Sequence, residues 1–112
     1  MKIRWLDASE APPLEMRSRI ERRVRLVVGR RAPIIDVLAI GLTGPSFDGR
    51  VVDASTSSLH RCRIRVRLAG GGGVVVEEQA AALDGAIEAA TWRLSRRLAR
   101  LSARMPLASS DA

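Results

Sequence analysis

The chain has 112 residues, of which 46% are hydrophobic and 28% are charged. This length suits one ordinary domain with no room for a second core, and the hydrophobic content argues against general disorder. Its 19 basic residues outnumber its 12 acidic ones, which gives a formal net charge of +7. Such an excess in a small domain indicates a polyanionic partner, with nucleic acid first and an anionic membrane second.

All the basic residues except Lys2 are arginine, which binds phosphate in a bidentate manner and stacks on bases as lysine does not. Cys62 is the only cysteine, so no intramolecular disulfide can form and a reducing compartment fits. The N-terminal residues have no apolar run of signal-peptide length, and no stretch approaches the roughly 18 apolar residues of a membrane span. We therefore expect a soluble cytoplasmic protein.

The first half of the chain predicts a strand, a helix and a second strand. Residues 2–6 alternate polar and apolar side chains, as a half-buried strand does. Residues 13–28 place apolar side chains at helical spacing, and Gly29 is a natural helix stop. Residues 34–42 form a short, β-branched apolar run that favours a central strand. Residues 43–59 hold Gly, Pro, Ser and Asp in the proportions of a flexible loop.

The second half predicts a β-hairpin followed by a long helix. Residues 60–68 alternate strictly between apolar and basic side chains, which is the clearest strand pattern in the chain. The glycine-rich residues 69–73 predict a turn, and residues 74–79 predict the returning strand. Residues 81–104 then predict a helix, and Pro106 prevents its continuation.

The predicted order is β-α-β-β-β-α, which indicates an α+β fold. Each helix has one apolar face that another layer must cover. A four-stranded sheet with both helices packed on one face covers both, and it leaves the other sheet face to solvent. We expect a single domain over residues 1–105 and a flexible C-terminal tail over residues 106–112.

The last predicted helix carries the most informative charge pattern. Its apolar residues recur at intervals of three and four and fall within a narrow wedge: Leu83, Ile87, Ala90, Leu94, Leu98 and Leu101. One flank of that wedge receives five arginines: Arg93, Arg96, Arg97, Arg100 and Arg104. A polyanion would relieve their mutual repulsion. The alternative is an ordinary solvated helix surface, since basic residues near a helix C-terminus also favour the helix dipole.

A second set of arginines lies on the predicted strand at 60–68. Alternation places them all opposite the apolar face, and therefore on the open face of the sheet: Arg61, Arg63, Arg65 and Arg67. They could bind a polyanion, or they could prevent edge-to-edge pairing of strands. Glu77 across the hairpin could neutralise one of them, most plausibly Arg65. The first helix adds Arg22 and Arg23, but nearby acids there favour an ordinary solvated face.

The sequence shows no catalytic constellation, and we expect neither an enzyme nor a cofactor or metal site. His60 and Cys62 are two residues apart and do not make a metal site on their own. Trp92 lies away from the apolar wedge, where it could stack on a base, contact a partner or shield the helix. Aromatic residues make up only 3% of the chain, which argues against binding single strands on aromatic platforms and favours recognition of phosphates and shape, as on structured RNA.

The predicted element order and the segment RCRIRVRLAGGGGVVVEEQAAALDGAIEAATWRLSRRLARL at 61–101 resemble the ribosome hibernation-promoting factor family. This family is also called the RaiA or sigma-54 modulation family. The pieces that carry the resemblance are RLAG after the third strand, LDGAI at the start of the last helix, and RLSRRLAR within it. The resemblance extends over roughly residues 1–104.

The resemblance implies a ribosome-associated RNA-binding protein that occupies the decoding region of the small subunit and inhibits translation, as a hibernation or stress factor. The family's basic positions match Arg93, Arg96 and Arg100, and more loosely Arg97. No counterpart of the dimerisation domain of long family members follows the last helix, which implies a monomer or a weak dimer. The alternatives are a general structured-RNA-binding module and a protein-interaction module with no ribosomal role.

Overall fold

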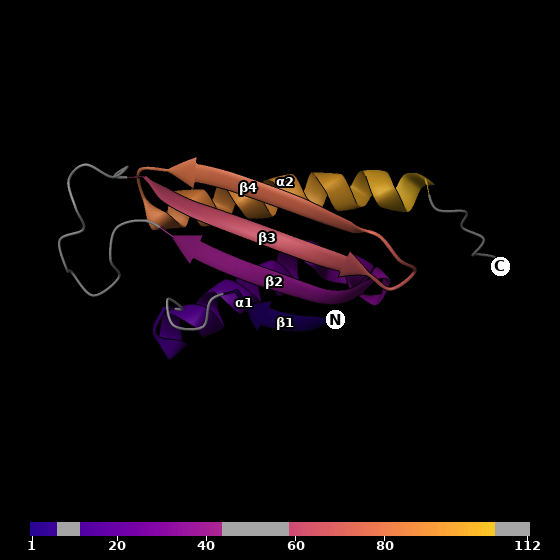
Figure 1. The fold of residues 1–112 in the computed structure, drawn as a ribbon, viewed down its shortest axis with the longest axis horizontal. Coiled ribbons are helices and arrows are strands. Elements are labelled where there is room, and N and C mark those ends of the chain that lie inside the picture. The colour runs from indigo at the N-terminus through magenta and orange to yellow at the C-terminus, as the bar shows by residue number, and fades with distance from the viewer. Residues whose placement is uncertain (7–11, 44–58, 105–112) are drawn as a thin grey trace.

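A computed structural model describes residues 1–6, 12–43 and 59–104 (Figure 1). Apart from Thr43 and Leu59, the predicted loop over 43–59 lies outside the described residues, as does the predicted tail over 106–112. The elements in chain order are β1 (Lys2–Trp5), α1 (Leu14–Val28), the 3-10 helix η2 (Gly29–Ile34), β2 (Ile35–Thr43), β3 (His60–Leu68), β4 (Gly73–Ala80) and α2 (Leu83–Arg104). The predicted α+β fold with the order β-α-β-β-β-α is confirmed.

The four strands form one sheet in the order β1-β2-β3-β4. Strands β2, β3 and β4 are antiparallel neighbours, whereas β1 runs parallel to β2. A parallel pair requires a crossover connection, and α1 supplies it. Figure 1 shows both helices behind the sheet, with α2 running along β3 and β4. Neither α1 nor α2 covers the opposite face of the sheet, as predicted.

The predicted stop of the first helix at Gly29 is confirmed. Gly29 has a φ of 54°, a left-handed conformation that glycine adopts without strain, and its backbone N–H donates to the carbonyl of Arg25. The chain then makes one 3-10 helix before β2 begins at Ile35, one residue later than predicted. Ile34 is the last residue of that 3-10 helix, and the second strand ends at Thr43, also one residue later than predicted.

The core lies between the sheet and the two helices. Alternate residues of the three long strands turn toward the helices and are buried: Leu38, Ile40, Leu42, Cys62, Ile64, Val66, Val74 and Val76. The helices contribute Ile20, Val24, Val28, Ile87, Ala90, Leu94 and Leu98. The apolar wedge predicted for the last helix is confirmed, with Leu83 and Leu101 partly buried at its ends. Because this wedge faces the sheet, the arginines beside it stay at the surface.

Because Cys62 is buried, the fold should lose stability as the pH rises into the alkaline range. Loss of hydration raises the pKa of its thiol from 9.0 to about 12. In the unfolded chain the thiol loses its proton above pH 9.0, so the unfolded state then binds fewer protons than the folded state. The contribution to stability is therefore constant below that pH and falls by about 1.4 kcal/mol for each pH unit above it. This fall continues until the folded thiol also titrates.

We expect urea unfolding to show this loss in the wild-type chain and not in Cys62→Ala. The variant loses some core packing at every pH, so the quantity to compare is the change of unfolding free energy with pH. Other titrating groups are common to both chains and cancel in the comparison. Parallel pH profiles for the two chains would show that the thiol does not titrate abnormally.

Candidate nucleic-acid interface

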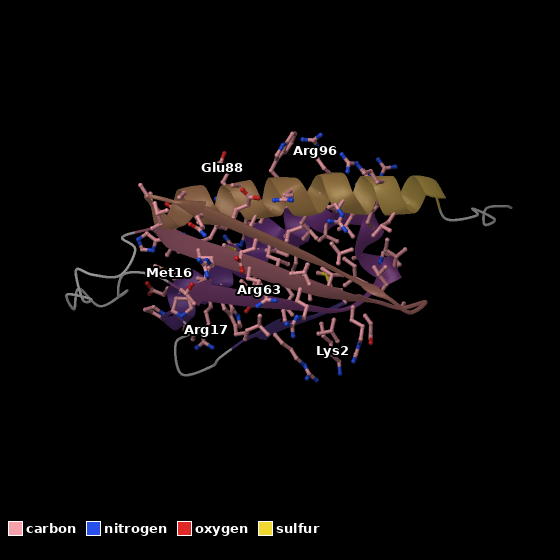
Figure 2. All side chains as sticks on the ribbon, turned by 45° about the horizontal axis from the view of Figure 1, so that its top comes forward. Lys2, Met16, Arg17, Arg63, Glu88 and Arg96 are labelled. Atoms are coloured by element: carbon pink, nitrogen blue, oxygen red, sulfur yellow. The ribbon has the colours of Figure 1, made fainter. Side chains whose placement is uncertain are left out.

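Four arginines gather on one side of α2, and we call this surface the α2 flank: Arg93, Arg96, Arg97 and Arg100. Together with Glu78, Ala89 and Trp92 they line a shallow depression of about 400 Å³. Figure 2 shows Arg96 pointing from α2 into solvent. The structure thus brings four of the five predicted arginines of this helix together. Arg104 is the last residue of α2, and its side chain lies outside the described part of the chain.

The charges of the α2 flank are only partly balanced. Arg93 Nη1 donates a hydrogen bond of 2.6 Å to Glu78 Oε2 on β4. This ion pair ties the flank to the edge of the sheet and reduces the net charge at that end. Within residues 1–6, 12–43 and 59–104, the structure shows no acidic partner for Arg96, Arg97 or Arg100. These three guanidinium groups are therefore available to an external anion.

A second basic surface lies on the sheet face opposite α1 and α2, and we call it the open sheet face. Its β3 row consists of the four predicted arginines, all exposed: Arg61, Arg63, Arg65 and Arg67. Strand β1 adds Lys2 and Arg4, whose register partners on β2 are Val37 and Ala39. The two basic rows therefore lie on either side of β2, roughly 10 Å apart at the usual spacing of strands.

The contribution of Lys2 and Arg4 to this surface was not predicted from the sequence. The signal was present, because both residues alternate with the partly buried Ile3 and Trp5. Their place beside the arginines of β3 depends on β1 pairing with β2 in parallel. Alternation within one strand carries no information about which strand lies next to it.

Two acidic residues neutralise part of the open sheet face. Glu77 lies between Arg61 and Arg63, with carboxylate oxygens 3.6 Å from Arg61 Nε and 4.0 Å from Arg63 Nε. Asp36 accepts a 3.0 Å hydrogen bond from Arg67 Nε and lies 2.9 Å from its Nη2. These pairs are solvent-exposed and each contributes at most about 1 kcal/mol.

The predicted pairing of Glu77 with Arg65 is wrong. The strand β4 begins at Gly73, and Gly73 pairs with Arg67, so the hairpin loop is shorter than the predicted turn over 69–73. This register places Glu77 opposite Arg63, and it places Val75 opposite Arg65. Arg65 consequently has no ion pair with any described residue, and it remains a free cation at the centre of the face.

The first helix contributes one arginine to the surroundings of α2. Arg23 Nη2 lies 3.9 Å from Glu88 Oε2, and this contact links the two helices. Arg22 is also exposed, but it makes no ion pair with any described residue and lines neither the depression on the α2 flank nor the groove between the helices. The structure therefore places Arg23 beside α2 and leaves Arg22 apart from both basic surfaces.

Strand β4 separates the two basic surfaces. Glu77 turns to the open sheet face, whereas Glu78 turns to α2, so an acidic residue faces each surface at this edge. In Figure 2, Arg63 lies over the sheet, Lys2 projects at the lower edge of the sheet, and Arg96 projects from α2 on the opposite side. The molecule therefore presents two distinct cationic surfaces.

Cys62 and His60 are two further chemistry-bearing side chains among the described residues. Cys62 is buried in the core, and His60 is half-buried at the start of β3. No group of three or more His, Cys, Asp or Glu side chains among the described residues is placed to hold a metal ion. None of the described helices combines the length and apolarity that crossing a membrane requires.

Comparison with solved structures places this architecture among known proteins. The N-terminal domain of Protein Y from Thermus thermophilus aligns with 89% of this chain and 94% of its own, at a TM-score of 0.60 and 24% identity. A ribosomal subunit interface protein from Coxiella burnetii aligns with 92% of this chain and 97% of its own, at a TM-score of 0.63 and 12% identity. This chain shares their fold.

At the level of the fold, the predicted resemblance to the ribosome hibernation-promoting factor family is thus confirmed. No protein-family model matches the sequence, and a search of curated proteins found no match. The shared fold spans about nine-tenths of the chain. At these identities the comparison establishes the fold alone.

Proposed function

We propose that this chain is a cytoplasmic, ribosome-associated RNA-binding protein that occupies the decoding region of the small subunit and inhibits translation, as a hibernation or stress factor. The observation that carries this proposal is the α2 flank, where Arg96, Arg97 and Arg100 have no acidic partner among the described residues. Support comes from the shared fold, since one of the two similar structures is named a ribosomal subunit interface protein.

The protein would act by occupancy and would catalyse no reaction. Arginine forks bind phosphate oxygens in a bidentate manner, and each neutralised phosphate releases condensed counterions. The free arginines of the α2 flank, together with Lys2, Arg4 and Arg65 on the open sheet face, offer about six such contacts. A domain held in this way would exclude mRNA and tRNA from the same space sterically.

Co-sedimentation with ribosomes on sucrose gradients, at low and at physiological salt, tests the proposal. We expect the protein to migrate with the small subunit at physiological salt, and an excess of unrelated duplex RNA should not displace it. With about six phosphate contacts, affinity should fall about a thousandfold between 50 and 200 mM salt. Displacement by the duplex would indicate a general structured-RNA-binding module. Absence of binding at both salt concentrations would contradict a ribosomal role.

A further inference from the structure

Trp92 is the one large aromatic side chain that the described part of the chain leaves mostly in water. It is 65% exposed, whereas Trp5 packs against the core and donates a 2.8 Å hydrogen bond from Nε1 to Glu21. Exposing an indole is unfavourable because much of its surface is apolar. Trp92 lies outside the apolar wedge of α2, so its ring is accessible to a partner.

The indole lies between two depressions of different character. On one side is the arginine-lined depression of the α2 flank. On the other side is a groove of about 570 Å³ between α1 and α2, lined mostly by apolar atoms. Its walls include Arg23 and Val27 from α1 and Glu88, Ala89 and Ser95 from α2. Trp92 lines both hollows and forms the ridge between them.

Cationic groups stand on both sides of this ridge. Glu88, Trp92 and Arg96 are four residues apart and therefore line up along one face of α2, and Figure 2 shows Glu88 and Arg96 projecting from that helix. Arg23 contacts Glu88 only at 3.9 Å, with both side chains well exposed. An exposed pair at that distance is weak, so Arg23 can exchange its carboxylate for a phosphate.

We infer that Trp92 is a stacking site for an unpaired RNA base, which enters the groove between α1 and α2 while its neighbouring phosphates bind Arg96 and Arg23. This inference rests on the proposed function and adds a preference for a single-stranded nucleotide. An apolar ridge between arginines matches the chemistry of a nucleotide, in which a flat aromatic base lies between anionic phosphates. An apolar protein segment would match the groove alone and would leave Arg96, which has no acidic partner among the described residues, without a counter-charge.

Base–aromatic stacking predicts a specific pattern among Trp92 variants. We expect Trp92→Ala to weaken binding to purified small ribosomal subunits by about 5- to 150-fold. Trp92→Phe keeps an aromatic face and should stay close to the wild-type affinity. Trp92→Leu keeps an apolar side chain without a π-face and should behave like Trp92→Ala. Leu26→Ala is the matched control, because Leu26 is a 76% exposed side chain on α1 that lines neither hollow.

Tryptophan fluorescence supplies a readout that does not depend on the ribosome. Titration with a short single-stranded oligoadenylate should quench the emission of Trp92, and a duplex of the same length should quench it far less. Trp92→Phe gives the background from Trp5. Equal quenching by both RNAs, or none, would overturn the inference, and so would wild-type affinity of Trp92→Ala for the subunits. If single strands quench Trp92 but the wild-type chain does not bind ribosomes, the proposed function fails and the stacking site stands.

Discussion

Reversing the charges of the α2 flank is expected to abolish ribosome binding while the domain stays folded. The variant changes Arg93, Arg96, Arg97 and Arg100 to glutamate, so phosphate attraction becomes repulsion at four neighbouring positions. Each lost phosphate contact should also reduce the salt dependence of binding by about one unit of slope. We expect the affinity, measured by co-sedimentation, to fall at least about a thousandfold.

A variant with three substitutions distinguishes a loss of binding from a loss of stability. Arg93 is hydrogen-bonded to Glu78, so its reversal places two carboxylates together and destabilises the contact between α2 and β4. Reversing only Arg96, Arg97 and Arg100 leaves that ion pair intact and should give nearly the same loss of binding.

The matched control reverses three exposed arginines outside both basic surfaces, namely Arg19, Arg25 and Arg30. It has the same change in net charge as the triple variant of the α2 flank. If the control loses as much affinity as the α2 variant, the net charge of the chain and not the α2 flank drives binding. Unchanged binding of the α2 variants would exclude α2 as the contact surface.

Truncation of Leu94 is expected to lower the stability of the domain strongly. Its side chain is fully buried between α2 and the sheet. Leu94→Ala should lower the free energy of unfolding by about 2–5 kcal/mol, because it removes buried apolar contacts and leaves a cavity. For a domain of this size, thermal unfolding should then shift down by roughly 4–8 °C for each kcal/mol lost.

Leu26→Ala makes the same chemical change at a 76% exposed helix position and should move the unfolding temperature little. Circular dichroism during heating compares the two variants directly. Equal shifts would contradict the packing of α2 against the sheet. The comparison also bears on function, because the α2 flank keeps its arrangement only while this wedge holds the helix in place.

Local patterns in the sequence were enough to predict the elements and the main basic surface. The wedge of α2 and the arginines beside it follow from the geometry of a single helix, in which residues three and four apart share a side. The β3 arginines follow in the same way from the two-residue period of a strand. Both patterns depend only on neighbours along the chain, so the sequence by itself determined them.

The tertiary structure determined which of these charged side chains lie close to one another. Whether Glu77 faces Arg63 or Arg65 depends on where the hairpin closes, and the two possible registers place different residues opposite the same glutamate. Lys2 and Arg4 join the open sheet face because α1 returns the chain to pair β2 with β1 in parallel. Trp92 lies beside Arg23 because two helices pack together on one sheet face. Each of these contacts joins residues far apart in sequence, and periodicity within one element carries no information about the packing that brings them together.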